Sequence, residues 1–313
     1  MLVKSATYPA NMVCDIKEHL DGYKIVCIAI GADNGYYILA VNNIPSRING
    51  MFPQIQTSTL HNYKVLIVQW DNVYTVNIDN KKWNYHLVQP TGNDRLLLAC
   101  ARSRYYGRNK YDLNGKIFDL NGNLIKEFLL GDGIQDMKVT DKNVIWTSYF
   151  DEGVFGNYGW HNPIGSYGLR SWNQEGESIY IHNNTDSHFI CDCYALNVVS
   201  DNEVWFYYYT DLLLGKIKGE KVDYFDPKLS GADGFLIYDR YVLFRGGYDK
   251  RDEYRLFEFG KGGNLKETRL ITFTDENDKI IAADNFDCRG SRLLLRVGSK
   301  LYSIDLVDII WKE

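Results

Sequence analysis

The chain has 313 residues, of which 45% are hydrophobic and 14% aromatic, so it can bury a substantial core. Its 35 Lys and Arg against 40 Asp and Glu give a formal net charge of −5, which argues against nonspecific nucleic-acid binding, a role that needs a basic face. The sequence has no apolar run near the ~18 residues of a membrane span, and its first residues lack the apolar core of a signal peptide. We therefore expect a cytoplasmic protein with neither membrane nor nucleic acid as a partner.

Short apolar runs rich in Val, Leu, Ile and aromatic residues recur along the chain, each bounded by turn residues. Runs of this length and composition predict strands that are buried on both faces. Their spacing of roughly 30–60 residues is typical of a β-propeller in which each blade contributes one such strand. The seven runs are Lys24–Ile30, Lys64–Trp70, Arg95–Ala101, Asn143–Tyr149, Glu203–Tyr209, Tyr241–Arg245 and Arg292–Val297.

The sequence thus predicts an all-β fold, a single β-propeller domain over residues 1–313 with about seven blades. The irregular spacing also allows six or five blades, and no Pro/Gly/Ser-rich linker divides the chain. In such a fold the last blade is tied to the first, since open sheet edges would pair with other molecules. Either Met1–Lys4 or Leu301–Leu306 would supply that strand.

Hairpins are predicted within the blades. Residues 114–128 alternate apolar and polar side chains on both sides of Asn121-Gly122, which predicts an outer hairpin with a type I′ turn. A strand, an Asp-led turn and an apolar strand recur in residues 134–149, 194–209 and 234–245.

One blade carries a long excursion, residues 150–168, between its second and third strands. It holds five glycines together with large aromatic side chains, which a solvated loop does not normally carry. Either these aromatic groups cover the protein's own core or they form a recognition surface. Under the second interpretation we predict a protein-binding site made of Asp151, Glu152, Phe155, Asn157, Tyr158, Trp160 and His161.

Signatures of other chemistry are weak. His182, His188, Cys191 and Cys193 lack the paired Cys-x2-Cys spacing of structural zinc sites. The chain has no Gly-x-Ser-x-Gly elbow, and its glycine-rich turn at 260–263 is followed by strand residues and not by a phosphate-binding helix. Asp151 and Glu152 are adjacent, so in an extended loop they would point apart and not act as an acid–base pair. We predict no metal, no cofactor and no enzymatic activity.

The basic stretch Arg102–Lys110 mixes cations with tyrosines, as single-strand nucleic-acid binders do. It is short and outweighed by the acidic remainder of the chain. We interpret it as a connecting loop with solvated charges.

The segment Trp146–Trp160, followed by Gly168-Leu169, resembles a group of poorly characterised bacterial propeller proteins that carry a similar Tyr-Phe-Asp-Glu-Gly-x-Phe/Tyr-Gly segment. The match lies in this one blade. The abundance of Asn, Lys, Ile and Tyr suggests an AT-rich bacterial gene of the kind found in mobile toxin–immunity cassettes. The chain therefore looks like an immunity protein of a contact-dependent inhibition, or polymorphic toxin, system.

The function that this resemblance implies is the binding and neutralisation of a cognate toxin domain, a nuclease, by a monomer that forms a one-to-one complex. Nuclease toxins bind a polyanion and are often basic, so an acidic protein would attract them. Two alternatives stay open: a propeller-class enzyme acting on glycans, which would gather Asp, Glu, His or Arg at one mouth of the fold, and a general protein-interaction scaffold.

Overall fold

The computed structural model describes residues 3–70, 72–92, 94–185, 187–248 and 250–311. Within these residues the structure is almost wholly β, and the longest helix has six residues. No described helix has the length and apolar character needed to cross a bilayer. The chain divides into two compact parts, a central part of residues 18–193 and a terminal part of residues 1–17 with 194–313. The predicted all-β fold is confirmed, and the single domain over residues 1–313 stays a prediction.

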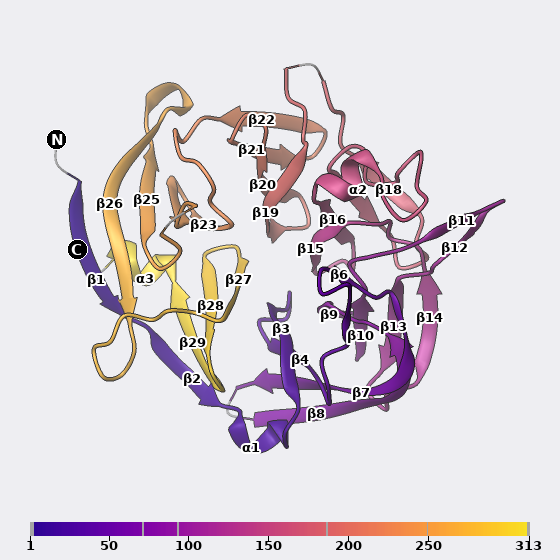
Figure 1. Cartoon of the computed structure of the whole chain (residues 1–313). Helices are drawn as coiled ribbons and strands as arrows, with labels where there is room; N and C mark the ends of the chain where they lie inside the picture. Colours follow the sequence, from indigo (N-terminus) through magenta and orange to yellow (C-terminus); the bar gives the residue numbers. More distant parts are fainter. Residues whose placement is uncertain (1–2, 71, 93, 186, 249, 312–313) are drawn as a thin grey trace. The chain divides into compact units, whose positions relative to one another are not determined.

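The central part contains three sheets of four antiparallel strands, each arranged in chain order (Figure 1). The first sheet is β3 (Lys24–Ile30), β4 (Tyr36–Val41), β7 (Gln56–Gln69) and β8 (Asn72–Trp83). The second is β9 (Leu87–Thr91), β10 (Arg95–Ala99), β13 (Gly115–Asp119) and β14 (Leu124–Phe128). The third is β15 (Ile134–Val139), β16 (Ile145–Tyr149), β17 (Leu169–Trp172) and β18 (Ser178–Ile181).

In each of these sheets a long excursion joins the second strand to the third. The first excursion, residues 42–55, holds the short strands β5 (Arg47–Ile48) and β6 (Phe52–Pro53). The second excursion, residues 100–114, holds the hairpin of β11 (Tyr105–Gly107) and β12 (Lys110–Tyr111), which extends away from the sheets (Figure 1). The third excursion, residues 150–168, holds the helix α2 (Asp151–Phe155), and a further helix, α1 (Lys17–Leu20), precedes the first sheet.

The terminal part also contains three sheets. The fourth sheet of the chain is β19 (Asp192–Ser200), β20 (Glu203–Tyr209), β21 (Leu213–Lys218) and β22 (Lys221–Phe225). The fifth contains β23 (Gly234–Tyr238), β24 (Tyr241–Arg245), β25 (Tyr254–Phe259) and β26 (Leu265–Thr274). The sixth contains β27 (Asn285–Arg289), β28 (Arg292–Val297) and β29 (Lys300–Asp305). The short helices η1 (Lys261–Gly263) and α3 (Leu306–Trp311) lie between β25 and β26 and after β29.

The N-terminal segment completes two of these sheets. Strand β2 (Asn11–Asp15) pairs antiparallel with β29 and supplies the fourth strand of the last sheet. Strand β1 (Lys4–Pro9) pairs parallel with β26 as a fifth strand. Of the two ends proposed for tying the last sheet, the N-terminal one is therefore used, although the strand is Asn11–Asp15 and not Met1–Lys4, of which Met1 and Leu2 lie outside the described residues.

The core of the central part lies between neighbouring sheets. Leu96 and Leu98 of β10 pack in one buried cluster with strands of the first sheet, whereas Leu97 and Ala99 pack in another with the third sheet. Because alternate residues of a strand point to opposite faces, both faces of β10 are buried, and its sequence is a continuous apolar run. The terminal part has two equivalent clusters between its own sheets.

The described residues form six large sheets, which is the six-bladed alternative that the sequence left open, and not seven. Five of the seven apolar runs are the second strands β10, β16, β20, β24 and β28. The remaining two, Lys24–Ile30 and Lys64–Trp70, fall on β3 and β7 of the same first sheet. An apolar run indicates a buried strand but does not show which strand of a blade it forms. Two runs of the first sheet therefore predicted two separate blades.

The outer hairpin of residues 114–128 is confirmed as β13–β14, but its turn is not type I′. Of Asn121 and Gly122 only the glycine has a positive φ, 80°. The carboxylate of Asp119 accepts the backbone N–H groups of Asn121 and Asn123 at 2.9 and 2.8 Å, and this side-chain bonding replaces the second left-handed residue.

We predict that Trp205→Ala lowers the free energy of unfolding by about 3–5 kcal/mol. Trp205 is 3% exposed and packs against Phe225 and Phe259 with ring centres 5.9 and 6.0 Å away. The matched control is Trp70→Ala, since Trp70 is 94% exposed and its loss should cost little. Urea denaturation of both variants measures the difference, and equal losses would contradict the assignment of Trp205 to the core.

Candidate functional site

The three excursions of the central part pack together at one end of its sheets. The backbone N–H of Tyr105, in the second excursion, donates to the carbonyl of Tyr158 in the third, at 3.0 Å. The Tyr158 hydroxyl donates to the carbonyl of Pro53 in the first, at 3.2 Å. The third excursion is therefore hydrogen-bonded to both of the others, and the three form one continuous surface.

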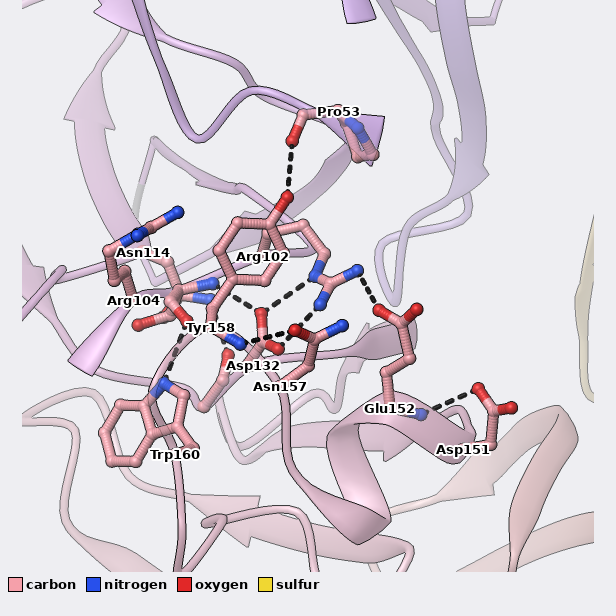
Figure 2. Close-up of polar contacts among 12 residues, drawn as sticks. Pro53, Arg102, Arg104, Asn114, Asp132, Asp151, Glu152, Asn157, Tyr158 and Trp160 are labelled. Atoms are coloured by element: carbon pink, nitrogen blue, oxygen red, sulfur yellow. Dashed lines mark hydrogen bonds and ion pairs between the residues drawn. The ribbon is translucent and has the colours of Figure 1, made fainter. Parts of the chain in front are cut away.

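A buried ion network lies beneath this surface (Figure 2). The Arg102 guanidinium donates from Nε and Nη2 to the two carboxylate oxygens of Asp132, at 2.9 Å each, and Nη1 bonds to Glu152 of α2. The side chains of Arg102 and Asp132 are 4% and 1% exposed, so both charges are almost fully removed from water. Burial opposes the charged form of Arg102, but the hydrogen bonds and charge of Asp132, then those of Glu152, raise its pKa above the ordinary value.

Glycines let helix α2 approach this network closely. A Cβ on Gly133, whose φ is 72°, would lie 2.4 Å from the backbone of Gly153. A Cβ on Gly153 would in turn lie 2.5 Å from the carbonyl of Asp132. The backbone N–H of Phe150 donates to the Gly133 carbonyl at 2.9 Å. The sequence Gly131-Asp132-Gly133 thus supplies both the carboxylate and the space that α2 needs.

Two aromatic residues of the third excursion face inward. Trp160 is 9% exposed, its Nε1 donates to the Ser103 carbonyl at 2.8 Å, and its ring lies 5.0 Å from that of Tyr105. The Tyr158 ring lies 4.3 Å from the guanidinium carbon of Arg102 and 5.0 Å from that of Arg104 (Figure 2). Tyr158 has a φ of 45°, which a bulky residue adopts only where its surroundings hold it. For these two residues the structure favours the interpretation in which the aromatics cover the protein's own core.

Other residues of the predicted site face solvent. Phe155 is 62% exposed, and its ring centre lies 6.2 Å from that of Phe189, which is 38% exposed. Asp151 and His161 are exposed as well. Burial and then the nearby charge of Asp151 raise the pKa of Asp192 to about 6. We call Asp151, Phe155, Phe189 and Asp192 the Phe155 surface.

The seven predicted site residues thus divide into two groups. Asp151, Phe155 and His161 are exposed, whereas Glu152, Tyr158 and Trp160 bond inward to hold the excursion. Asn157 is half-buried, and its side-chain oxygen accepts the backbone N–H of Tyr158 at 2.7 Å. Asp151 and Glu152 do separate, although they do so on a helix and not in an extended loop.

Arg102 and Asp132 were missed from the sequence. The interpretation of Arg102–Lys110 as solvated charges holds for Arg104, Arg108 and Lys110, which are exposed, but it is wrong for Arg102, which is 3% exposed. The available signal was Asp132, an acidic residue placed between two glycines just before the strand β15.

Two histidines of the central part, His86 and His182, have lowered pKa values. Burial, then the charges of Arg47 and Arg102, lowers the pKa of His86 to about 4, and its Nδ1 accepts the Ala101 N–H at 3.1 Å. Burial, then His188, lowers the pKa of His182 to about 4. Across the described ranges no three His, Cys, Asp or Glu side chains are grouped as metal ligands, the segment from His182 to Cys193 included.

The comparisons with known proteins agree with this architecture. The YxzG family matches residues 181–304, which is less than half of the chain. No curated protein matches the sequence. Among solved structures, YCF48 from Cyanidioschyzon merolae is 12% identical with a TM-score of 0.50, over 94% of this chain and 84% of its own.

Two further structures are similar at lower scores. The β-propeller domain of Cps50 (Swd1) from Myceliophteria thermophila is 12% identical with a TM-score of 0.47, over 94% of this chain and 99% of its own. The gluconolactonase XC5397 from Xanthomonas campestris is 10% identical with a TM-score of 0.43, over 97% and 99% of the two chains. The likeness to YCF48 and the six large sheets of the described residues define the class: the chain is an all-β β-propeller with six blades.

We predict that Arg102→Gln lowers the free energy of unfolding by about 3–5 kcal/mol, because it leaves the buried Asp132 carboxylate without its cation. Lys126→Gln is the matched control, since the Lys126–Glu175 pair is exposed, with side chains 37% and 61% accessible, and should cost less than about 1 kcal/mol. Urea denaturation at pH 7 measures both. A loss for Arg102→Gln no larger than that for the control would show that the network does not stabilise the fold.

A pH-dependent effect is expected at Asp192. Its pKa is about 6 in the folded state against an ordinary 3.8, so its contribution to stability is complete below pH 3.8 and is lost as the pH rises through 6. Asp192→Asn, which cannot ionise, should therefore match the parent at pH 4 and exceed its stability at pH 7. Because the side chain is only half-buried, we expect a gain on the order of 1 kcal/mol. Asp239→Asn is the control, and a gain independent of pH would contradict the shift.

Proposed function

We propose that this chain is a non-enzymatic β-propeller that binds a protein partner on the Phe155 surface, and that the partner is a basic toxin domain which the chain neutralises. The observation that carries the proposal is the exposed aromatic pair formed by Phe155, on the firmly held helix α2, and Phe189, in the loop before β19. Aromatic side chains of this kind are the usual anchors of protein interfaces.

The way α2 is held supports a binding role. Glu152 bonds to buried Arg102, and the Gly133–Gly153 contact fixes the helix against the sheet. A side chain presented on a fixed backbone loses less conformational freedom when a partner binds. Glu152, Tyr158 and Trp160 accordingly position the surface, whereas Asp151 and Phe155 make the contact.

The charges of the surface favour a cationic partner. Burial and then the charge of Asp151 raise the pKa of Asp192, so the Asp151 carboxylate opposes the ionisation of Asp192. A Lys or Arg side chain of the partner would offset this effect and speed association. The identification of the partner as a toxin rests on the sequence resemblance, and none of the structures named above is an immunity protein.

The test is co-expression with a candidate toxin domain from a neighbouring gene, together with calorimetric titration of the two purified proteins. We expect Phe155→Ala/Phe189→Ala to weaken binding by about 30-fold or more, a loss of about 2 kcal/mol typical of interface anchors. Raising salt should slow association more than it speeds dissociation.

The control is Trp70→Ala, which removes an exposed aromatic side chain elsewhere. Unchanged affinity in the folded double variant would remove the Phe155 surface from the interface. Failure of the unaltered protein to bind or neutralise the neighbouring toxin would refute the immunity role.

A further inference from the structure

A cleft of about 840 Å³ lies at the other end of the three sheets of the central part. It is lined by residues of the turns between neighbouring strands, among them Asp33, Asp94 and Asn143. Strand β16 begins at Ile145, directly after this cleft, and ends at Tyr149, directly before α2. The cleft and the Phe155 surface are therefore at opposite ends of the same sheet.

The cleft combines an apolar interior with an aromatic wall. Ile67 and Leu96 line it and are 7% and 1% exposed, so they form a closed floor. Tyr74 and Leu120, which are 55% and 41% exposed, line it nearer the solvent. Its volume is in the range of small-molecule sites, which is about 300–1,000 Å³.

The charged groups of the cleft are mostly negative. Its lining contains the three carboxylates of Asp33, Asp94 and Asp141 and the single guanidinium of Arg95. In the part of the chain that the structure describes, none of these four groups takes part in an ion pair. The described lining residues therefore carry a formal charge of −2.

One of the carboxylates is held in place by neutral donors. Asp33 accepts the backbone N–H of Gly35 at 3.1 Å, the Tyr37 hydroxyl at 2.6 Å and the Gln69 amide at 2.6 Å. These bonds fix its orientation without neutralising its charge. Burial, then Asp33 and finally the charge of Asp94, raises the pKa of Tyr37, so both carboxylates act on the same point of the cleft.

We propose that this cleft binds a small organic cation, an ammonium or guanidinium group on a short aliphatic chain. The carboxylates would receive the cationic group, and the Tyr74 ring offers a face on which such a group is attracted. The apolar floor would take the aliphatic chain. A bare metal ion fits less well, since no metal-ligand group of His, Cys, Asp or Glu occurs in the described ranges.

The proposal is independent of the proposed function, because the two sites share no residue. The test is isothermal titration of the full-length protein, at low salt, with putrescine and agmatine as probes and 1-butanol as the uncharged comparison. We expect Kd values below about 1 mM for the two cations and at least tenfold weaker binding of the alcohol.

Asp94→Asn/Asp141→Asn should weaken putrescine binding by about tenfold or more, since the variant removes two of the three carboxylates that line the cleft. Both side chains are exposed, so the variant is expected to fold, and circular dichroism checks this. Asp239→Asn removes an exposed carboxylate of the terminal part and should leave binding unchanged.

Three results would overturn the proposal. They are no heat with either cation at millimolar concentration, equal affinity in the double variant, and binding of a lysine-containing peptide without binding of the free amines. The last result would assign the cleft to a protein segment and not to a small cation. None of them would bear on the Phe155 surface.

Discussion

The burial of the Arg102 guanidinium constrains much of the central part. A charge that is removed from water is stable only where its partners are close and well oriented, and Arg102 meets this condition through two carboxylates from other segments. Asp132 precedes the first strand of the third sheet, and Glu152 follows its second strand. The ion network therefore fastens the third sheet and its helix to the end of the second sheet, and the orientation of α2 follows from it.

Arg–Asp pairs recur at the same end of other sheets. Asp233 and Asp284 each come directly before the first strand of a sheet, whereas Gly133 stands between Asp132 and its strand β15. Asp233 forms an ion pair with Arg245, and Asp284 forms one with Arg296. Each arginine lies on the second strand of the same sheet, opposite the residue that follows its aspartate in the chain. In the central part the arginine is Arg102, which follows β10 of the second sheet, whereas Asp132 precedes the third sheet. This Arg–Asp pair therefore joins two neighbouring sheets, while the other two pairs each lie within a single sheet.

The two ends of the central sheets differ in chemistry. At one end long excursions pack on one another, bury an ion network and leave the Phe155 surface exposed. At the other end short turns surround a cleft whose carboxylates carry no counter-ion in the described residues. The strands between them are buried on both faces, so they separate the two surfaces rigidly.

The sequence by itself determined the class of fold, the position of the buried strands and the excursion that carries α2. Apolar runs such as Arg95–Ala101 can be recognised in the sequence because a strand buried on both faces needs apolar side chains at nearly every position. The same runs do not show which strands share a sheet, and so Lys24–Ile30 and Lys64–Trp70 were assigned to two blades. Pairing depends on long-range contacts that local composition does not record.

The tertiary structure alone decided which side chains of the candidate site face inward. Arg102 reads as one of several solvated cations because it lies in a polar stretch, and the sequence leaves open whether Trp160 covers the core or forms an interface. Arg102 can be buried because Asp132 and Glu152 bond to it, and these partners lie 30 and 50 residues away in the chain. Trp160 can be buried because its indole N–H donates to the Ser103 carbonyl, which lies 57 residues away in the chain. A charge or an indole is stable in the interior only when such distant partners reach it, and folding alone brings them together.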